Sequence, residues 1–434
     1  MIKPSDICYS SGFNNEHESE ALPGALPIGQ FNPQKCAYGL YAEQFSSTAF
    51  TAPRHENRRT WMYRIRPSIS MGDYSVIDKG LVRTAPLSGA PCPPNVMRWN
   101  PQLIPDTPTD FIDGLITVAA NGDAKTQIGM GIHLYCANKA MDNRYFCNAD
   151  GELLFVPQQG ELVARTELGL LHVKPGEIMV IPRGIKFQIE PTSQAIRGYI
   201  CENYGALFTL PERGPVGANG FANQRDFQYP TASFEDKQQA SKLITKFCGE
   251  QYQADLEHCP LDVVAWVGNS APYKYDLSRF NVINTVSFDH PDPSIFTVLT
   301  SPSETQGTAN IDFVVFPPRW MVAENTFRPP WYHRNVMSEF MGLVHGVYDA
   351  KEKGFEPGGM SLHNCMTPHG PEADVFEKAS NGVLSPQKYA NTLAFMFESR
   401  YVIAPTEFAI QATTRQKDYL SCWGNLNKHF NGQA

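Results

Sequence analysis

Short apolar runs separated by glycine and proline recur along the whole chain. Four of these runs have the length of a strand and end at glycine or proline on at least one side: residues 151–157, 160–164, 177–182 and 311–316. Helical patterns are fewer, the best being residues 233–243 and 385–389, each with a serine suited to capping at its start. The pattern predicts a mostly β protein with a few short helices.

Length and charge narrow the class of protein. The 434 residues exceed what one hydrophobic core usually holds, so we expect two domains or one large elaborated domain. The 36 basic and 44 acidic residues give a net charge of −8 without any block of like charge, which argues against nucleic-acid and anionic-membrane partners. A small uncharged or anionic metabolite fits this surface.

The chain carries no signal for export or membrane insertion. Residues 1–6 lack an apolar stretch, and no run approaches the roughly eighteen apolar residues that a membrane helix needs. The ten cysteines form no C-x-x-C pair, so neither a disulfide framework nor a thiolate zinc site is indicated. We therefore expect a cytoplasmic protein with reduced thiols.

Two imidazoles and one carboxylate stand out as candidate metal ligands: His333, Glu339 and His369. Two histidines and a carboxylate on one face of an ion are typical of non-haem Fe(II) oxygenases, and they leave positions open for a substrate and O2. Taken singly, each residue is as well explained as a partly buried histidine, a strand-end acid or a loop histidine. His345 follows the apolar run 340–344 and is expected to be structural.

Geometry restricts how His333 and Glu339 can meet. In an unbroken strand they would lie roughly 20 Å apart, and in a helix about 240° apart around the axis. Neither arrangement allows one shared metal. A tight turn within residues 334–338 would bring Glu339 beside His333, with Asn335 on the same face. His369 must then come from a neighbouring strand, as in a barrel with inward-facing side chains.

Two spaced motifs resemble those of the cupin superfamily. Gly176-x5-Pro182-x-Gly184-x2-Phe187 is similar to the second cupin motif, whose last position is usually a metal-binding histidine. His333-x-Asn335-x3-Glu339-x6-Gly346 is similar to the first motif, with asparagine in place of its second histidine. We therefore expect two cupin-like barrels: a degenerate one without metal in residues 1–280, and one carrying the metal in residues 281–434.

Longer segments resemble the homogentisate 1,2-dioxygenase family over nearly the whole chain. They are SGFNNE (11–16), NPQ (32–34), LYAEQ (40–44), GANG (217–220), NQRDF (223–227), VVAW (263–266), FDHPDPSIFT (288–297), FRPPWYHRN (327–335), MSEFMG (337–342) and MTPHGP (366–371). The departures are Trp331, where some relatives carry tyrosine, and the residues after about 400, which match loosely. The role of that C-terminal tail is therefore open.

The resemblance implies a set of site residues. His333, Glu339 and His369 would bind Fe(II), with His369 also facing the substrate. His290 would accept a proton, and Tyr348 and His363 would contact the substrate. Without the resemblance, His290 is as well explained as a turn residue and Tyr348 as an exposed strand tyrosine. His363 is as well explained as a residue that orients a metal ligand. A free phenol has a pKa of about 10 and a histidine one of about 6.5. If a phenol oxygen binds the metal and gives its proton to such a histidine, a phenolate becomes available at the metal.

The resemblance also implies the reaction and the assembly. The enzyme would convert homogentisate and O2 to 4-maleylacetoacetate in tyrosine and phenylalanine catabolism, as a homohexamer built as a dimer of trimers. Two other functions fit the cupin motifs. One is a dioxygenase for another hydroxylated aromatic acid such as gentisate, and the other is a metal-dependent sugar isomerase or a non-catalytic ligand-binding bicupin. All of these alternatives predict no O2 uptake with homogentisate.

Overall fold

The computed structural model describes residues 4–89, 91–212, 220–286, 296–351 and 353–432. Strands dominate it, and the part described contains two α-helices, α1 (Ala373–Asn381) and α2 (Glu407–Gln411). The predicted mostly β fold with a few short helices is confirmed. No helix of the described residues has the length and apolar character to span a bilayer.

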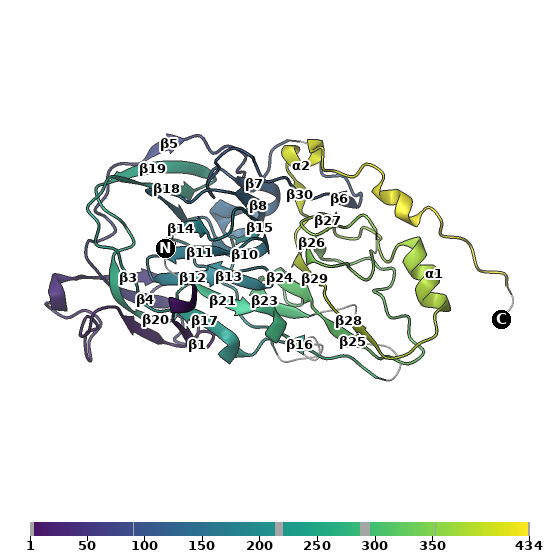
Figure 1. The fold of residues 1–434 in the computed structure, drawn as a ribbon, viewed down its shortest axis with the longest axis horizontal. Coiled ribbons are helices and arrows are strands. Elements are labelled where there is room, and N and C mark those ends of the chain that lie inside the picture. Colours follow the sequence, from purple (N-terminus) through teal and green to yellow (C-terminus); the bar gives the residue numbers. More distant parts are fainter. Residues whose placement is uncertain (1–3, 90, 213–219, 287–295, 352, 433–434) are drawn as a thin grey trace.

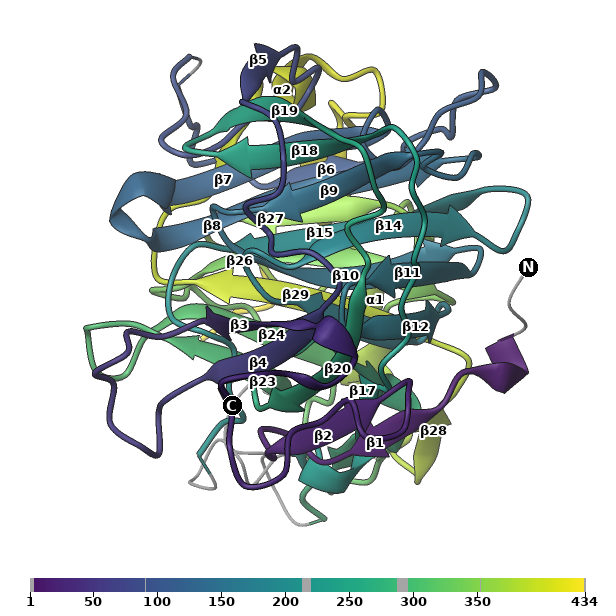
Figure 2. The ribbon, with the colours of Figure 1, turned by 90° about the vertical axis from the view of Figure 1, so that its left-hand side faces the viewer.

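Two large sheets form the N-terminal unit, at the left of Figure 1. The nine-stranded sheet runs in the order β1 (Tyr9–Ser11), β17 (Phe227–Pro230), β21 (Tyr273–Asp276), β13 (Glu177–Ile181), β10 (Glu152–Gln159), β15 (Ile196–Asn203), β8 (Ile128–Ala137), β7 (Leu115–Asp123) and β30 (Ala404–Pro405). The seven-stranded sheet, seen in front in Figure 2, runs in the order β12 (Gly169–Val173), β11 (Leu162–Thr166), β14 (Lys186–Pro191), β9 (Arg144–Asn148), β18 (Ser241–Phe247), β19 (Glu250–Leu256) and β5 (Ser75–Ile77).

A six-stranded sheet builds the C-terminal unit, at the right of Figure 1. Its order is β23 (Thr297–Pro302), β24 (Ala309–Phe316), β29 (Leu393–Ser399), β26 (Ser338–His345), β27 (Met360–His363) and β6 (Met97–Trp99). Smaller sheets complete the molecule: β2 (His17–Glu20), β20 (Val263–Gly268), β4 (Arg59–Arg64) and β3 (Tyr41–Ser46); β16 (Gly220–Phe221) with β22 (Asn281–Val282); and β25 (Arg319–Met321) with β28 (Gln387–Tyr389).

Strict alternation gives the six-stranded sheet two different faces. Phe340, Phe395 and Phe397 point toward the N-terminal unit, where the ring of Phe395 meets that of Tyr199 on β15 at 4.9 Å. The next residue along each strand points the other way, into the C-terminal unit, and this second face includes Met341. The sheet is therefore the wall between the units, and its second face is the floor of the site described below.

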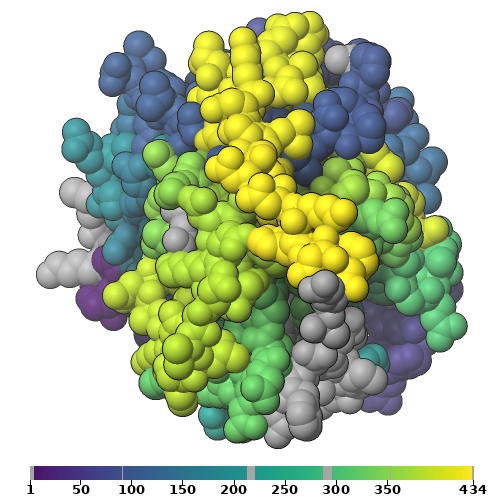
Figure 3. Space-filling model, turned by 90° about the vertical axis from the view of Figure 1, so that its right-hand side faces the viewer, coloured from purple at the N-terminus to yellow at the C-terminus, as the bar shows by residue number. Residues whose placement is uncertain are grey.

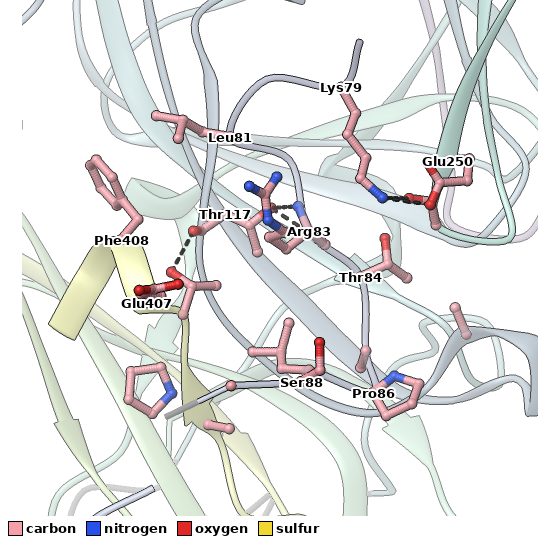
Figure 4. Close-up of a pocket in the computed structure, with 18 of the residues that line it drawn as sticks. Lys79, Leu81, Arg83, Thr84, Pro86, Ser88, Thr117, Glu250, Glu407 and Phe408 are labelled. Atoms are coloured by element: carbon pink, nitrogen blue, oxygen red, sulfur yellow. Dashed lines mark hydrogen bonds and ion pairs between the residues drawn. The ribbon is translucent and has the colours of Figure 1, made fainter. Parts of the chain in front are cut away.

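The two units exchange strands at this wall. Strand β6 comes from the N-terminal half but pairs with β27 at the edge of the six-stranded sheet. Conversely, β30 pairs with β7 of the nine-stranded sheet, and the Thr406 hydroxyl donates to the Thr117 carbonyl at 2.9 Å. Figure 4 shows Glu407 and Phe408 of the returning segment beside Thr117, where the segment borders a cavity of about 690 Å³. The domain boundary between 280 and 281 stays a prediction.

An aromatic cluster around Phe187 lies between the two large sheets of the N-terminal unit. Phe187 is fully buried, and its ring lies 5.7 Å from Phe146, 6.0 Å from Phe111 and 6.2 Å from Phe155. Phe155 comes from the nine-stranded sheet and the other strand residues from the seven-stranded sheet, so these rings join the two sheets. The absence of a metal from this unit stays a prediction.

Both helices predicted from the sequence are wrong. Residues 231–240 have no regular secondary structure, and residues 241–243 belong to β18. The backbone N–H of Glu235 bonds the Leu261 carbonyl at 2.8 Å, and the Lys237 carbonyl accepts from Cys259 N–H at 3.0 Å. Residues 387–389 form β28, paired with β25. Tertiary hydrogen bonds thus override weak local helix preference in both segments.

Buried Glu152 makes stability depend on pH. Burial raises the pKa of this carboxyl to about 7, although hydrogen bonds from Phe208 N and Asn203 and the charge of Arg183 act against the shift. Between the ordinary value of 4.5 and 7 the folded state holds a proton that the unfolded chain has lost, so stability falls as pH rises through that window. We expect Glu152→Gln to gain on the order of 3 kcal/mol at pH 8 and almost nothing below pH 4.5. Urea unfolding at the two pH values measures this, and an equal gain at both would contradict it.

Candidate metal centre

A short pair of backbone hydrogen bonds brings the two histidines together. His333 N–H bonds the His369 carbonyl at 2.9 Å, and His369 N–H bonds the His333 carbonyl at 3.1 Å, in an isolated antiparallel bridge. Their rings lie 4.3 Å apart. Glu339, the second residue of β26, reaches the same point from the sheet, with carboxylate oxygens 3.7 Å from His333 Nε2 and 2.9 Å from His369 Nε2. One ligand atom from each residue lies within 4.8 Å of the other two.

Hydrogen bonds to the backbone fix which ring nitrogens face inward. His333 Nδ1 lies 2.6 Å from the Trp331 carbonyl, and His369 Nδ1 lies 2.9 Å from the Thr367 carbonyl. A carbonyl oxygen only accepts, so each Nδ1 carries a proton. Each Nε2 faces the Glu339 carboxylate, to which it donates when protonated, and a cation bound between them would displace that proton and take the lone pair. A carbonyl partner behind the ring is the usual setting of a metal-binding histidine. Two lone pairs and a carboxylate that converge in this way fit a divalent cation.

The charge of the centre is also set by its surroundings. Glu339 is 5% exposed. Burial alone would raise its pKa, but the imidazoles of His333, His363 and His369 hold the pKa well below its usual value, so the side chain is a carboxylate. A buried carboxylate that keeps its charge is a strong anionic ligand for a cation.

A row of acidic side chains crosses the floor of the site. Glu398 on β29 lies opposite Glu339, and Asp312 on β24 lies opposite Glu398. Asn335 Nδ2 approaches a carboxylate oxygen of Glu339 at 3.4 Å and one of Glu398 at 3.5 Å, so it links the first two acids. Burial, together with the neighbouring acids, raises the pKa of Glu398 well above its usual value, and burial also raises that of Asp312.

On the other side of Glu339, its register partner His363 is held by two polar groups. Its Nε2 lies 3.3 Å from Lys351 Nζ and 3.2 Å from Tyr419 Oη. Burial, with the charges of Lys351 and His369, keeps the pKa of His363 well below its usual value, so the imidazole is neutral. Burial and the charge of Arg98 lower the pKa of Lys351 to about 7.

These residues surround one cavity of about 480 Å³. The sequence-predicted residues that line it are His333, Glu339, Tyr348, His363 and His369. Tyr348 is 6% exposed, which excludes the alternative of a surface tyrosine. His345 is exposed and is not among the lining residues, which argues against a role as a fourth metal ligand. His290 falls outside the described residues.

Four residues at the site were missed from the sequence: Asp312, Lys351, Glu398 and Tyr419. Asp312 and Glu398 did carry a signal, because each is a single acid within an otherwise apolar strand pattern. Lys351 and Tyr419 carried none, since only the fold brings the loop after β26 and the C-terminal tail to His363.

Comparisons with known proteins agree with one another. The family model described as homogentisate 1,2-dioxygenase N-terminal matches residues 8–277, and the model described as homogentisate 1,2-dioxygenase C-terminal matches residues 278–430. A homogentisate 1,2-dioxygenase from Bradyrhizobium diazoefficiens is 59% identical over 423 residues, which cover 97% of this chain and 94% of the relative.

Among solved structures, the matches are distant. A point mutant of oxalate decarboxylase from Bacillus subtilis shares 9% identity at a TM-score of 0.28, covering 74% of this chain and 79% of that one. Quercetin 2,3-dioxygenase from Acinetobacter baumannii shares 7% identity at a TM-score of 0.28, covering 73% and 85%. These TM-scores are too low to bear on the fold or the function.

Proposed function

Because this chain belongs to the homogentisate 1,2-dioxygenase family, we propose that it binds Fe(II) through His333, Glu339 and His369 and opens the ring of homogentisate with O2 to give 4-maleylacetoacetate. The observation that carries the proposal is the convergence of two histidine Nε2 atoms and one carboxylate at the wall of a cavity of about 480 Å³. When bound, Fe(II) supplies a Lewis acid for a phenolic oxygen and a redox partner for O2.

The side chains around the centre have separate tasks. His333 and His369, each anchored to a backbone carbonyl, and Glu339 would hold the metal, and the cavity that they line would receive the substrate. Arg334 is exposed at the rim of the same cavity and can pair with the carboxylate of the acetate arm. His290 would accept the phenolic proton, as the family resemblance implies.

Tyr348 and His363 supply polar contacts to the substrate from the cavity wall. The pKa of Tyr348 is raised well above its usual value by burial, so the phenol keeps its proton and can donate to an oxygen that gains negative charge. Family membership also supports a cytoplasmic homohexamer arranged as a dimer of trimers, which we include in the proposal.

The test is a single-enzyme reaction with controlled O2. The protein is loaded with Fe(II) without air, homogentisate is added, and air is then admitted while O2 and the absorbance of the ring-opened product are followed. We expect one O2 consumed per homogentisate and a much slower reaction with gentisate. No turnover by folded, iron-loaded protein would refute the proposal, and an equal rate with gentisate would overturn the choice of substrate.

A further inference from the structure

His363 presents two ring nitrogens with very different surroundings. It is the last residue of β27 and is 1% exposed. Its Nε2 faces Lys351 Nζ at 3.3 Å and Tyr419 Oη at 3.2 Å. Its Nδ1 has no hydrogen-bond partner among the described residues; a Glu339 carboxylate oxygen lies 3.9 Å away, beyond hydrogen-bond distance.

The partners of Nε2 decide the tautomer. An ammonium group has three N–H donors and no lone pair, so a charged Lys351 can approach Nε2 only if Nε2 accepts. Lys351 also donates to Ser361 Oγ at 3.1 Å, which fixes the direction of its head group. The Tyr419 hydroxyl, whose pKa burial raises, retains a proton that it can point at the same nitrogen. With Nε2 as acceptor, the single ring proton of a neutral imidazole must be on Nδ1.

Residues from the N-terminal half and from the C-terminal tail together fix the position of Tyr419. The Arg98 guanidinium lies over its ring at 4.2 Å. Arg98 is fixed in turn by Glu372 at 3.0 Å and by the side chain of Gln416 at 2.5 Å. Gln416 and Tyr419 belong to the C-terminal tail, which crosses the surface of the C-terminal unit in Figure 3, whereas Arg98 belongs to β6 from the N-terminal half.

From this geometry we propose that Lys351 and Tyr419 act as positioning residues that hold His363 in its Nδ1–H form, so that Nδ1 donates a hydrogen bond to the bound aromatic acid. The inference rests on the proposed function for the identity of that acid. A buried N–H without a partner is destabilising. A substrate oxygen that takes this position removes the cost, and the C-terminal tail thereby becomes part of the active site.

The first measurement concerns the metal-free protein and needs no turnover. Ring-¹⁵N histidine labelling distinguishes a protonated from an unprotonated ring nitrogen, and the His363 signals are assigned by their loss in His363→Gln. At pH 6, where Lys351 is charged, we expect a protonated Nδ1 in the wild type and a mixture of tautomers in the Lys351→Met/Tyr419→Phe double variant. A protonated Nε2 in the wild type would overturn the proposal, as would a double variant with unchanged signals.

The second measurement uses two amides that each replace one ring nitrogen. The asparagine amide ends near the position of Nδ1 and the glutamine amide near that of Nε2. We expect His363→Asn to bind homogentisate without air within about tenfold of the wild type, and His363→Gln and His363→Leu to bind at least a hundredfold more weakly, all with unchanged Fe(II) content. Equal binding by the asparagine and glutamine variants would contradict a donor at Nδ1.

A matched control separates this role from general folding. Tyr401→Phe removes a surface hydroxyl that lies 3.4 Å from Glu304, and we expect it to change neither the ¹⁵N signals nor substrate binding. If the wild type shows Nδ1–H but consumes no O2 with homogentisate, the proposed function fails while the tautomer stands. If it turns over homogentisate with a protonated Nε2, the tautomer fails alone.

Discussion

Replacing Glu339 by glutamine is expected to lower kcat on the order of 10³-fold, which corresponds to about 4 kcal/mol. The amide keeps the size of the side chain but removes the negative charge that offsets the metal, and it leaves two neutral imidazoles as the remaining strong ligands. The variant should show a lower iron content, measured by elemental analysis after dialysis, and a correspondingly lower rate of O2 uptake.

The matched control for this change is Glu377→Gln on α1. That carboxylate is 43% exposed, lies 3.1 Å from His429 Nε2, accepts from Asn381 Nδ2 at 3.3 Å and is not among the residues that line the cavity. It should keep one Fe(II) per chain and full activity. An E339Q protein with wild-type iron content and kcat would show that the metal sits elsewhere.

The largest effect on stability is expected at Arg64 on β4. Its guanidinium is 1% exposed and meets three carboxylates: Asp262 at 2.8 Å, Glu43 at 2.8 Å and Glu167 at 3.1 Å. Arg64→Met removes the shared cation from the buried carboxylates of Asp262 and Glu167. Asp262 then keeps the Arg66 N–H at 2.9 Å, and Glu167 keeps the Lys186 N–H at 2.9 Å and its Nζ at 3.8 Å. Breaking a buried pair from one side typically costs about 3–5 kcal/mol.

Urea unfolding at pH 7 and one fixed protein concentration measures this cost, because assembly would otherwise shift the midpoint. Lys139→Met is the control, since Lys139 pairs with Asp142 at 3.4 Å on the surface and such pairs contribute less than about 1 kcal/mol. Equal midpoints for the two variants would mean that the Arg64 cluster relaxes or admits water when the cation is removed.

Much of the fold could be predicted because its signals are local. Apolar runs bounded by glycine or proline predicted the strands at 152–159, 162–166, 177–181 and 309–316 within two residues. The motif glycines are explained in the same way: Gly176 has φ +94° and Gly346 has φ +79°, and a Cβ at Gly346 would lie 2.1 Å from the Asn391 carbonyl oxygen. Local signals of this kind need no knowledge of the partner strand.

What could not be predicted depends on distant contacts. The exchange of β6 and β30 between the units leaves no trace in the strands themselves, because three- and two-residue segments carry no usable pattern. The same holds for the site. The turn that joins His333 to Glu339 follows from their spacing, whereas the contacts of Tyr419 with His363 and Arg98 arise only when the tail is folded over the second unit.

The most direct test of the metal assignment is a crystal of the Fe(II)-loaded protein, with diffraction measured on both sides of the iron absorption edge. We expect one anomalous peak per chain, in contact with His333 Nε2, His369 Nε2 and the Glu339 carboxylate. A peak anywhere else, or a second peak in the aromatic core around Phe187, would contradict a single iron centre in the C-terminal unit.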